Sequence, residues 1–159
     1  MMNKRLKQGS TFLLAVALTF PLLTLPGAKA ANAIDTDAEC SIQFDIGGNS
    51  SELLSASIPV NLYKVASVDV SGNYTATGTF AKLDLSSVSA DNLDTAAATW
   101  SERAAEAKKL LKDDTEPTTT VTLTQGRGTA TGLDTGLYLV DTPKVITTNY
   151  TYTFTPYLV

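Results

Sequence analysis

The sequence predicts a mainly β protein, a β-sandwich of about seven short strands with one inserted α-helix. Three observations lead to this prediction. Apolar and polar residues alternate in several short runs, turn residues separate these runs at regular spacing, and one segment instead has helical periodicity.

The first half of the expected fold contains three strands. Glu39–Ile46 places its apolar residues on one face and is the expected first strand. Ile58–Val70 has apolar residues on both faces, which favours a strand between a core and a covering element. Tyr74–Phe80 follows a tight turn and is expected to form a hairpin with that strand. Gly47–Ser51 is expected to be a turn.

The helix is expected over Thr95–Lys112. Asp94 or Thr95 can cap its start, and Pro117 makes continuation past Glu116 unfavourable. Lysines near its end complement the helix dipole. Its buried stripe consists of small residues with one large anchor: Ala96, Trp100, Ala104, Ala107 and Leu111.

Four further strands are expected after the helix. They are Thr118–Thr124, Thr129–Leu133, Leu137–Thr142 and Tyr150–Val159. The last of these is expected to close the sandwich, with Pro156 at an edge position or at the exit of the strand.

The first 30 residues have the layout of a secretory signal peptide. Three basic residues precede the apolar run Thr11–Leu25, and Ala28-Lys29-Ala30 is a small-x-small cleavage site with Ala28 and Ala30 at its recognition positions. The run is shorter than the ~20 residues of a membrane-spanning helix. We therefore expect residues 1–30 to be removed on export, residues 31–38 to be a flexible leader, and residues 39–159 to form one domain.

Charge argues against a nucleic-acid or anionic-lipid partner. The whole chain has net charge −4. Four of its twelve basic residues and none of its sixteen acidic ones lie in the signal peptide, so the mature chain has eight basic residues and net charge −8. Such a surface repels phosphate backbones and anionic membranes. Contact with a membrane is expected only through the signal peptide during export.

Residue types exclude most catalytic chemistry. The chain has no histidine and one cysteine, Cys40. Histidine-dependent nucleophilic catalysis, a histidine or thiolate zinc site and an internal disulfide are therefore ruled out. We predict no enzyme activity, no metal and no cofactor.

Two covalent cross-links remain open as hypotheses. One is an amide bond between Lys64 and Asn149, with Asp45 or Asp69 as the acid, which requires a neutral amine in an apolar setting. The alternative for Lys64 is a side chain that reaches solvent at the sheet edge. The second hypothesis is a thioester between Cys40 and a glutamine such as Gln125.

Several strings in the chain resemble a known family. They are Val60–Ala66 (VNLYKVA), Gly72–Tyr74 (GNY), Gly136–Val140 (GLYLV) and Tyr152–Val159 (YTFTPYLV), in that order and with a helical insert between them. Together they resemble the N-terminal domain of Gram-positive, sortase-assembled pilin subunits. The resemblance implies an immunoglobulin-like sandwich related to collagen-adhesin B-type modules, with a structural role at the cell surface.

The chain also departs from that family. No Tyr-Pro-Lys pilin motif, sorting signal or membrane helix follows Val159, so the sequence is expected to be a truncated N-terminal portion. The expected function is a non-catalytic structural domain of a pilus or wall-anchored protein. Its expected partners are other pilin or surface-protein subunits, and sortase only if a longer chain exists. The alternative is a secreted or surface adhesin module that binds a host protein or glycan.

Overall fold

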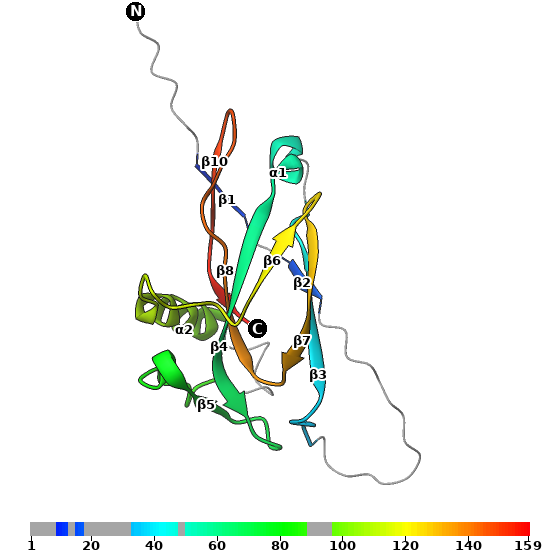
Figure 1. Ribbon diagram of the computed structural model, residues 1–159. Coiled ribbons are helices and arrows are strands. Elements are labelled where there is room, and N and C mark those ends of the chain that lie inside the picture. The colour runs from blue at the N-terminus through cyan, green and yellow to red at the C-terminus, as the bar shows by residue number, and fades with distance from the viewer. Residues whose placement is uncertain (1–8, 13–14, 18–32, 48–49, 89–96) are drawn as a thin grey trace, which may run out of the picture.

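The computed structural model describes residues 9–12, 15–17, 33–47, 50–88 and 97–159. The protein is mainly β, with curled, largely antiparallel sheets and few helices (Figure 1). Within these residues, no helix is long and apolar enough to cross a bilayer. The elements in chain order are β1 Gly9–Phe12, β2 Ala15–Ala17, β3 Glu39–Asp45, α1 Ser51–Ser55, β4 Ile58–Val68, β5 Tyr74–Ala76, the 3₁₀ turn η1 Gly78–Phe80, α2 Ala97–Leu110, β6 Thr119–Leu123, β7 Arg127–Asp134, β8 Leu137–Asp141, β9 Val145–Ile146, β10 Thr151–Phe154 and β11 Tyr157–Leu158.

The central strand is β4, the longest strand of the described chain. It pairs with β8 along one edge, and its other edge is shared by β6 over Ile58–Leu62 and by β5 over Ala66–Val68. The register with β8 shifts between Lys64 and Ala66, which marks a β-bulge at Val65. The strand order around β4 is therefore β11-β8-β4-β5, with β6 beside β4.

Both faces of the β4–β8 layer are buried. Toward β3 and β7, one cluster contains Leu62 of β4 together with Tyr138 and Val140 of β8. Toward α2, a second cluster contains Leu137 and Leu139 of the same strand. Alternate residues of β8 thus enter opposite cores, and all five of its residues are buried. This confirms the prediction that the strand beginning at Ile58 lies between a core and a covering element.

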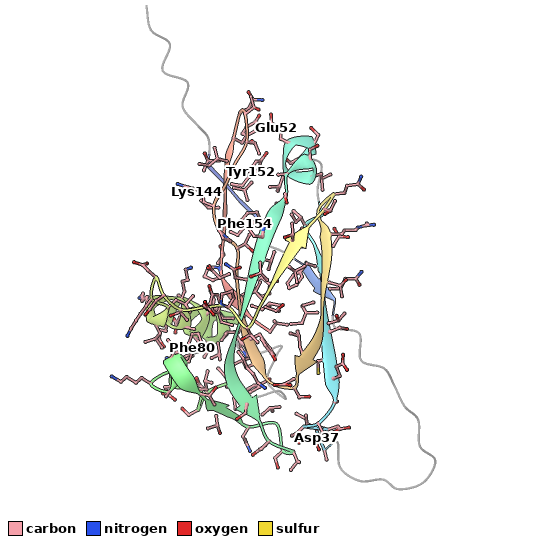
Figure 2. All side chains as sticks on the ribbon, in the orientation of Figure 1. Asp37, Glu52, Phe80, Lys144, Tyr152 and Phe154 are labelled. Atoms are coloured by element: carbon pink, nitrogen blue, oxygen red, sulfur yellow. The ribbon has the colours of Figure 1, made fainter. Side chains whose placement is uncertain are left out.

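The covering element is α2. Ala104 and Ala107 are fully buried against the sheet, and Trp100 and Leu111 pack beside them, which confirms the predicted stripe for these positions. Small side chains let the helix approach the sheet closely. Phe80 of η1 also belongs to this second core (Figure 2). Asp94, Thr95 and Ala96, the expected cap and first stripe residue, lie outside the described residues.

The expected last strand, Tyr150–Val159, is two strands. β10 pairs with β9, and β11 pairs with β8, and both ladders keep one common register. The β8–β11 and β9–β10 pairs are therefore two parts of one long hairpin. Pro143 separates β8 from β9, and Pro156 separates β10 from β11. Proline has no N–H to give to a ladder, so each proline divides its strand.

Two more sequence expectations are corrected by the structure. The strand expected over Tyr74–Phe80 ends at Ala76, and Gly78, with φ +57°, begins the turn η1. Of the expected turn Gly47–Ser51, residues 48–49 lie outside the described residues, and Ser51 begins the short helix α1, whose N-cap Ser50 accepts a hydrogen bond from the Leu53 amide. A helix of five residues is too short to produce a periodic pattern.

The remaining sheet contains β3 and its neighbours. β3 pairs with β7 along one edge and with β2 along the other, both antiparallel. β1 lies parallel to β10. Figure 1 shows β1 beside β10 and β2 beside β3, so two segments from the predicted signal peptide lie on the edges of two different sheets.

Candidate functional site

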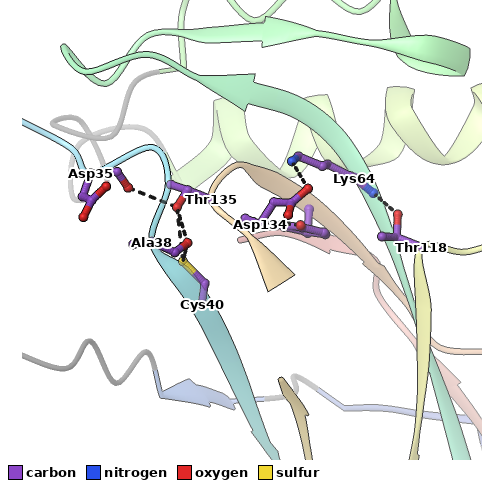
Figure 3. Close-up of polar contacts among 8 residues, drawn as sticks. Asp35, Ala38, Cys40, Lys64, Thr118, Asp134 and Thr135 are labelled. Carbon is purple, nitrogen blue, oxygen red and sulfur yellow. Dashed lines mark hydrogen bonds and ion pairs between the residues drawn. The ribbon is translucent and has the colours of Figure 1, made fainter. Parts of the chain in front are cut away.

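The structure places Lys64 in β4 with an acidic partner that the sequence did not indicate. Its Nζ donates to Asp134 Oδ2 at 2.9 Å, and its backbone amide donates to Thr118 Oγ1 at 2.9 Å (Figure 3). The lysine side chain is 26% exposed and that of Asp134 81% exposed. This ion pair is solvated, and the amine lies at the surface rather than in an apolar setting.

Asn149 lies in the loop between β9 and β10, beside α1. Its side-chain amide donates to Glu52, and the Thr147 hydroxyl donates to the same carboxylate at 2.5 Å. These hydrogen bonds lower the pKa of Glu52, chiefly the one from Thr147. The cluster joins α1 to the tip of the β9–β10 hairpin, and Figure 2 shows Glu52 and Tyr152 at that end of the molecule.

The two candidate acids have partners of their own. Asp45 accepts hydrogen bonds from the Gly47 amide and from Arg127 Nε, each at 3.0 Å, and the first of these is the main cause of its lowered pKa. Asp69 organises the turn before β5, where it accepts from Asn73 at 2.9 Å.

The predicted amide cross-link is therefore not assembled. No polar contact within the described chain joins any two of Lys64, Asn149 and Asp45. Glu52, the partner of Asn149, lies before the start of β4, and Lys64 lies six residues into that strand, about 20 Å along it. The residues that the sequence grouped as one site lie in separate polar contacts.

The thioester pair is also separated. Cys40 lies at the start of β3, where its Sγ is 3.5 Å from Thr135 Oγ1. Gln125 lies in the turn before β7, with φ 52°. In the β3–β7 ladder Cys40 pairs with Leu133, whereas the turn with Gln125 adjoins the opposite end, at the Asp45–Arg127 pair.

The structure reveals one semi-buried ionic contact that sequence reasoning missed. Lys108 of α2 donates to Asp141 Oδ2 at the end of β8, and the Asp141 side chain is only 11% exposed. Tyr63 lies near this pair, and burial, with a smaller contribution from the Asp141 charge, raises the pKa of the tyrosine. The sequence contained one signal for this contact, because the acidic residue Asp141 directly follows the apolar run Leu137–Val140.

These polar contacts connect separate elements of the fold. Over the ranges that the structure describes, no group of three histidine, cysteine, aspartate or glutamate residues is arranged to hold a metal ion. The polar clusters join α1 to the loop between β9 and β10, β4 to β7, and α2 to β8. Comparisons with protein-family models, with curated proteins and with solved structures found no match.

Proposed function

We propose that this protein is a non-catalytic structural domain of an exported surface protein, an immunoglobulin-like sandwich of the kind that begins Gram-positive pilin subunits. The proposal rests first on the strings that resemble that family, and second on where these strings lie in the fold. Its partners are other subunits of the same surface assembly.

The observation that carries the proposal is the adjacency of segments from three of the four resembling strings. Val60–Ala66 lies in β4, and Leu137–Val140 forms most of β8. The fourth string is divided: Tyr157–Leu158 is β11, whereas Tyr152–Phe154 belongs to β10 of another sheet. β8 pairs with β4 on one side and with β11 on the other. Segments distant in sequence therefore lie side by side in one sheet, which supports the proposal that these segments are a shared structural signature.

The arrangement of β8 between β4 and β11 suits a domain that bears mechanical load. The hydrogen bonds of antiparallel strands run perpendicular to the chain direction. A pull along β8 therefore loads its bonds to both neighbours at once rather than one after another. α2 covers the same sheet and is fastened to the end of β8 through Lys108 and Asp141.

The first test follows export in the cells that carry the gene. Mass spectrometry of the extracellular and wall fractions should find a chain that begins at Ala31. The variant Ala30→Arg should block processing and retain the precursor, whereas Lys29→Gln, one residue away, should be processed normally. An intact chain beginning at Met1 in the cytoplasm would overturn the proposal.

The second test separates a structural domain from an adhesin. An antibody against the domain should detect it in high-molecular-weight wall material that survives boiling in detergent. Release of a monomer that binds immobilised host proteins or glycans would favour the adhesin function instead.

A further inference from the structure

One edge of β10 and one edge of β3 are each paired with a short strand from the predicted signal peptide. β1 pairs with β10 from Gly9↔Thr151 to Phe12↔Phe154, in parallel. β2 pairs with β3 from Ala15↔Asp45 to Ala17↔Gln43, antiparallel. One stretch of nine residues thus supplies a strand neighbour to both edges.

Export would remove that neighbour. Cleavage after Ala30 separates residues 9–17 from the domain and leaves the N–H and C=O groups along those edges without strand partners. Exposed edges of this kind readily pair with another extended chain. Beneath them lie core residues that are almost fully buried in the complete chain: Ile42, 4% exposed, Phe44, 0%, and Tyr152, 3%.

We propose that β10 and β3 of the processed chain form an acceptor site for one extended segment of a partner subunit. This inference rests on the proposed export and processing. The segment is uncharged and largely apolar, like Gly9–Ala17 (GSTFLLAVA), and runs parallel to β10 and antiparallel to β3. Its backbone completes the two sheets as β1 and β2 do in the unprocessed chain.

The domain's own leader is fastened elsewhere. The Ile34 amide donates to Val70 O at 3.0 Å, and the Thr135 hydroxyl donates to Asp35 O and Ala38 O at 3.2 and 2.9 Å (Figure 3). These contacts hold the leader at the Glu39 end of β3, whereas β2 pairs with the opposite end, at Gln43–Asp45.

A second copy is also a poor donor. Every described strand from β3 onward already has a strand partner in its own sheet. A copy that donated one of them would lose the ladder bonds that the strand makes at home. The donor is therefore a segment of another subunit that is not part of such a sheet. Pairing through backbone groups with alternate side chains toward the core is an established mode of peptide recognition.

The test uses the full chain with a specific protease site placed between residues 19 and 28. After folding and cleavage, the protein is incubated with an excess of a fluorescent peptide of the sequence Gly9–Ala17. The peptide should replace the cut segment and elute with the protein in gel filtration. Hydrogen exchange should remain slow at Thr151–Phe154 and Gln43–Asp45 with the peptide bound, and become faster when the peptide is stripped away.

The matched control is the same peptide with Ser10→Pro and Thr11→Pro. Successive N–H groups point to opposite sides of a strand, so one of these prolines must remove a donor that faces β10. We expect at least about tenfold weaker binding. Equal binding of the two peptides, no incorporation, or unchanged exchange after stripping would overturn the acceptor site.

Three outcomes separate this inference from its alternatives. If the cut and stripped protein forms a stable dimer that excludes the peptide, the edges pair with a second copy and the partner-strand proposal is wrong. A retained precursor in cells would overturn the proposed function and would also remove the premise of the acceptor site, because the edges of β10 and β3 are freed only by processing. If cells export and process the chain but the peptide does not replace the cut segment, only the acceptor-site inference is overturned.

Discussion

Lys108 of α2 donates a hydrogen bond to Asp141, the last residue of β8, and so ties the covering helix to the most deeply buried strand. The carboxylate is 11% exposed and the ammonium side chain 46% exposed. A charge in such a position is costly without its partner, because burial removes most of its hydration.

Removal of that ammonium should destabilise the domain. We expect Lys108→Met, which keeps the aliphatic stem, to lower the free energy of unfolding by about 1–3 kcal/mol, because Asp141 is left unpaired. Urea denaturation measures the loss. The control Lys109→Met changes an exposed lysine of the same helix and should have an effect within about 0.5 kcal/mol. The double variant Lys108→Met with Asp141→Asn should recover part of the loss.

A side chain at position 136 should destabilise the domain. A Cβ at this position would lie 2.6 Å from the carbonyl oxygen of Ala66, which belongs to the backbone of β4 and cannot move aside easily. We expect Gly136→Ala to cost about 2–3 kcal/mol in thermal or urea unfolding. Gly128→Ala is the comparison, since its Cβ would lie 2.7 Å from the side-chain carbons Leu123 Cδ2 and Val121 Cγ1 and would meet backbone only at the ordinary contact distance of 3.5 Å, at Thr122 O. An equal or smaller cost at Gly136 would contradict the close approach of the two strands.

Ser50 should stabilise α1 through two contacts. Its Oγ accepts from the Leu53 amide at 3.4 Å and lies 2.6 Å from the Tyr152 hydroxyl in β10. Ser50→Ala should therefore lower the stability by about 0.5–2 kcal/mol. Ser51→Ala, at the next, exposed position, should change it little. Hydrogen exchange of the Leu53 amide should rise in the first variant only.

Tyr138 should make the domain sensitive to alkali. Burial, with a smaller contribution from the Asp134 charge, raises its pKa to about 12 from the ordinary 10.0. The hydroxyl also donates to Asp134 O at 2.8 Å. Because the folded state holds this proton more tightly than the unfolded state, the stabilisation is fully present below pH 10 and is lost as the pH rises to about 12.

Stability measured across that range gives the check. We expect Tyr138→Phe to be somewhat less stable than the wild type at pH 8 and to lose less stability between pH 10 and pH 12. Absorbance at 295 nm reports tyrosinate formation. Tyr150→Phe, at an exposed position, should leave the slope unchanged. An unaltered slope in Tyr138→Phe would show that other groups cause the alkaline loss.

Local pattern predicted much of the fold because it reports which face of each segment is buried. The alternation in Glu39–Ile46, the double-sided apolar pattern of β4 and the stripe of α2 all appear in the structure as predicted. The division of the last strand was missed, although Pro156 was recognised as an edge or exit position. α1 and β9 were missed because each is too short to show a period.

The site was much harder to predict than the fold. Lys64, Asn149 and Asp45 were grouped by chemistry alone, and the structure gives each a separate partner. The Lys108–Asp141 contact joins residues 33 positions apart, and no periodicity connects them.

The sequence alone was sufficient for the mainly β class, the helix α2 and the buried faces of β3, β4 and α2, since these follow from short-range periodicity and from which side chains avoid water. Only the tertiary structure decided which strands are neighbours, which charges meet, and that two segments near the N-terminus lie on the edges of β10 and β3. The physical reason is that strand pairing and ion pairing depend on distances between remote segments, and those distances are set by how the whole chain packs.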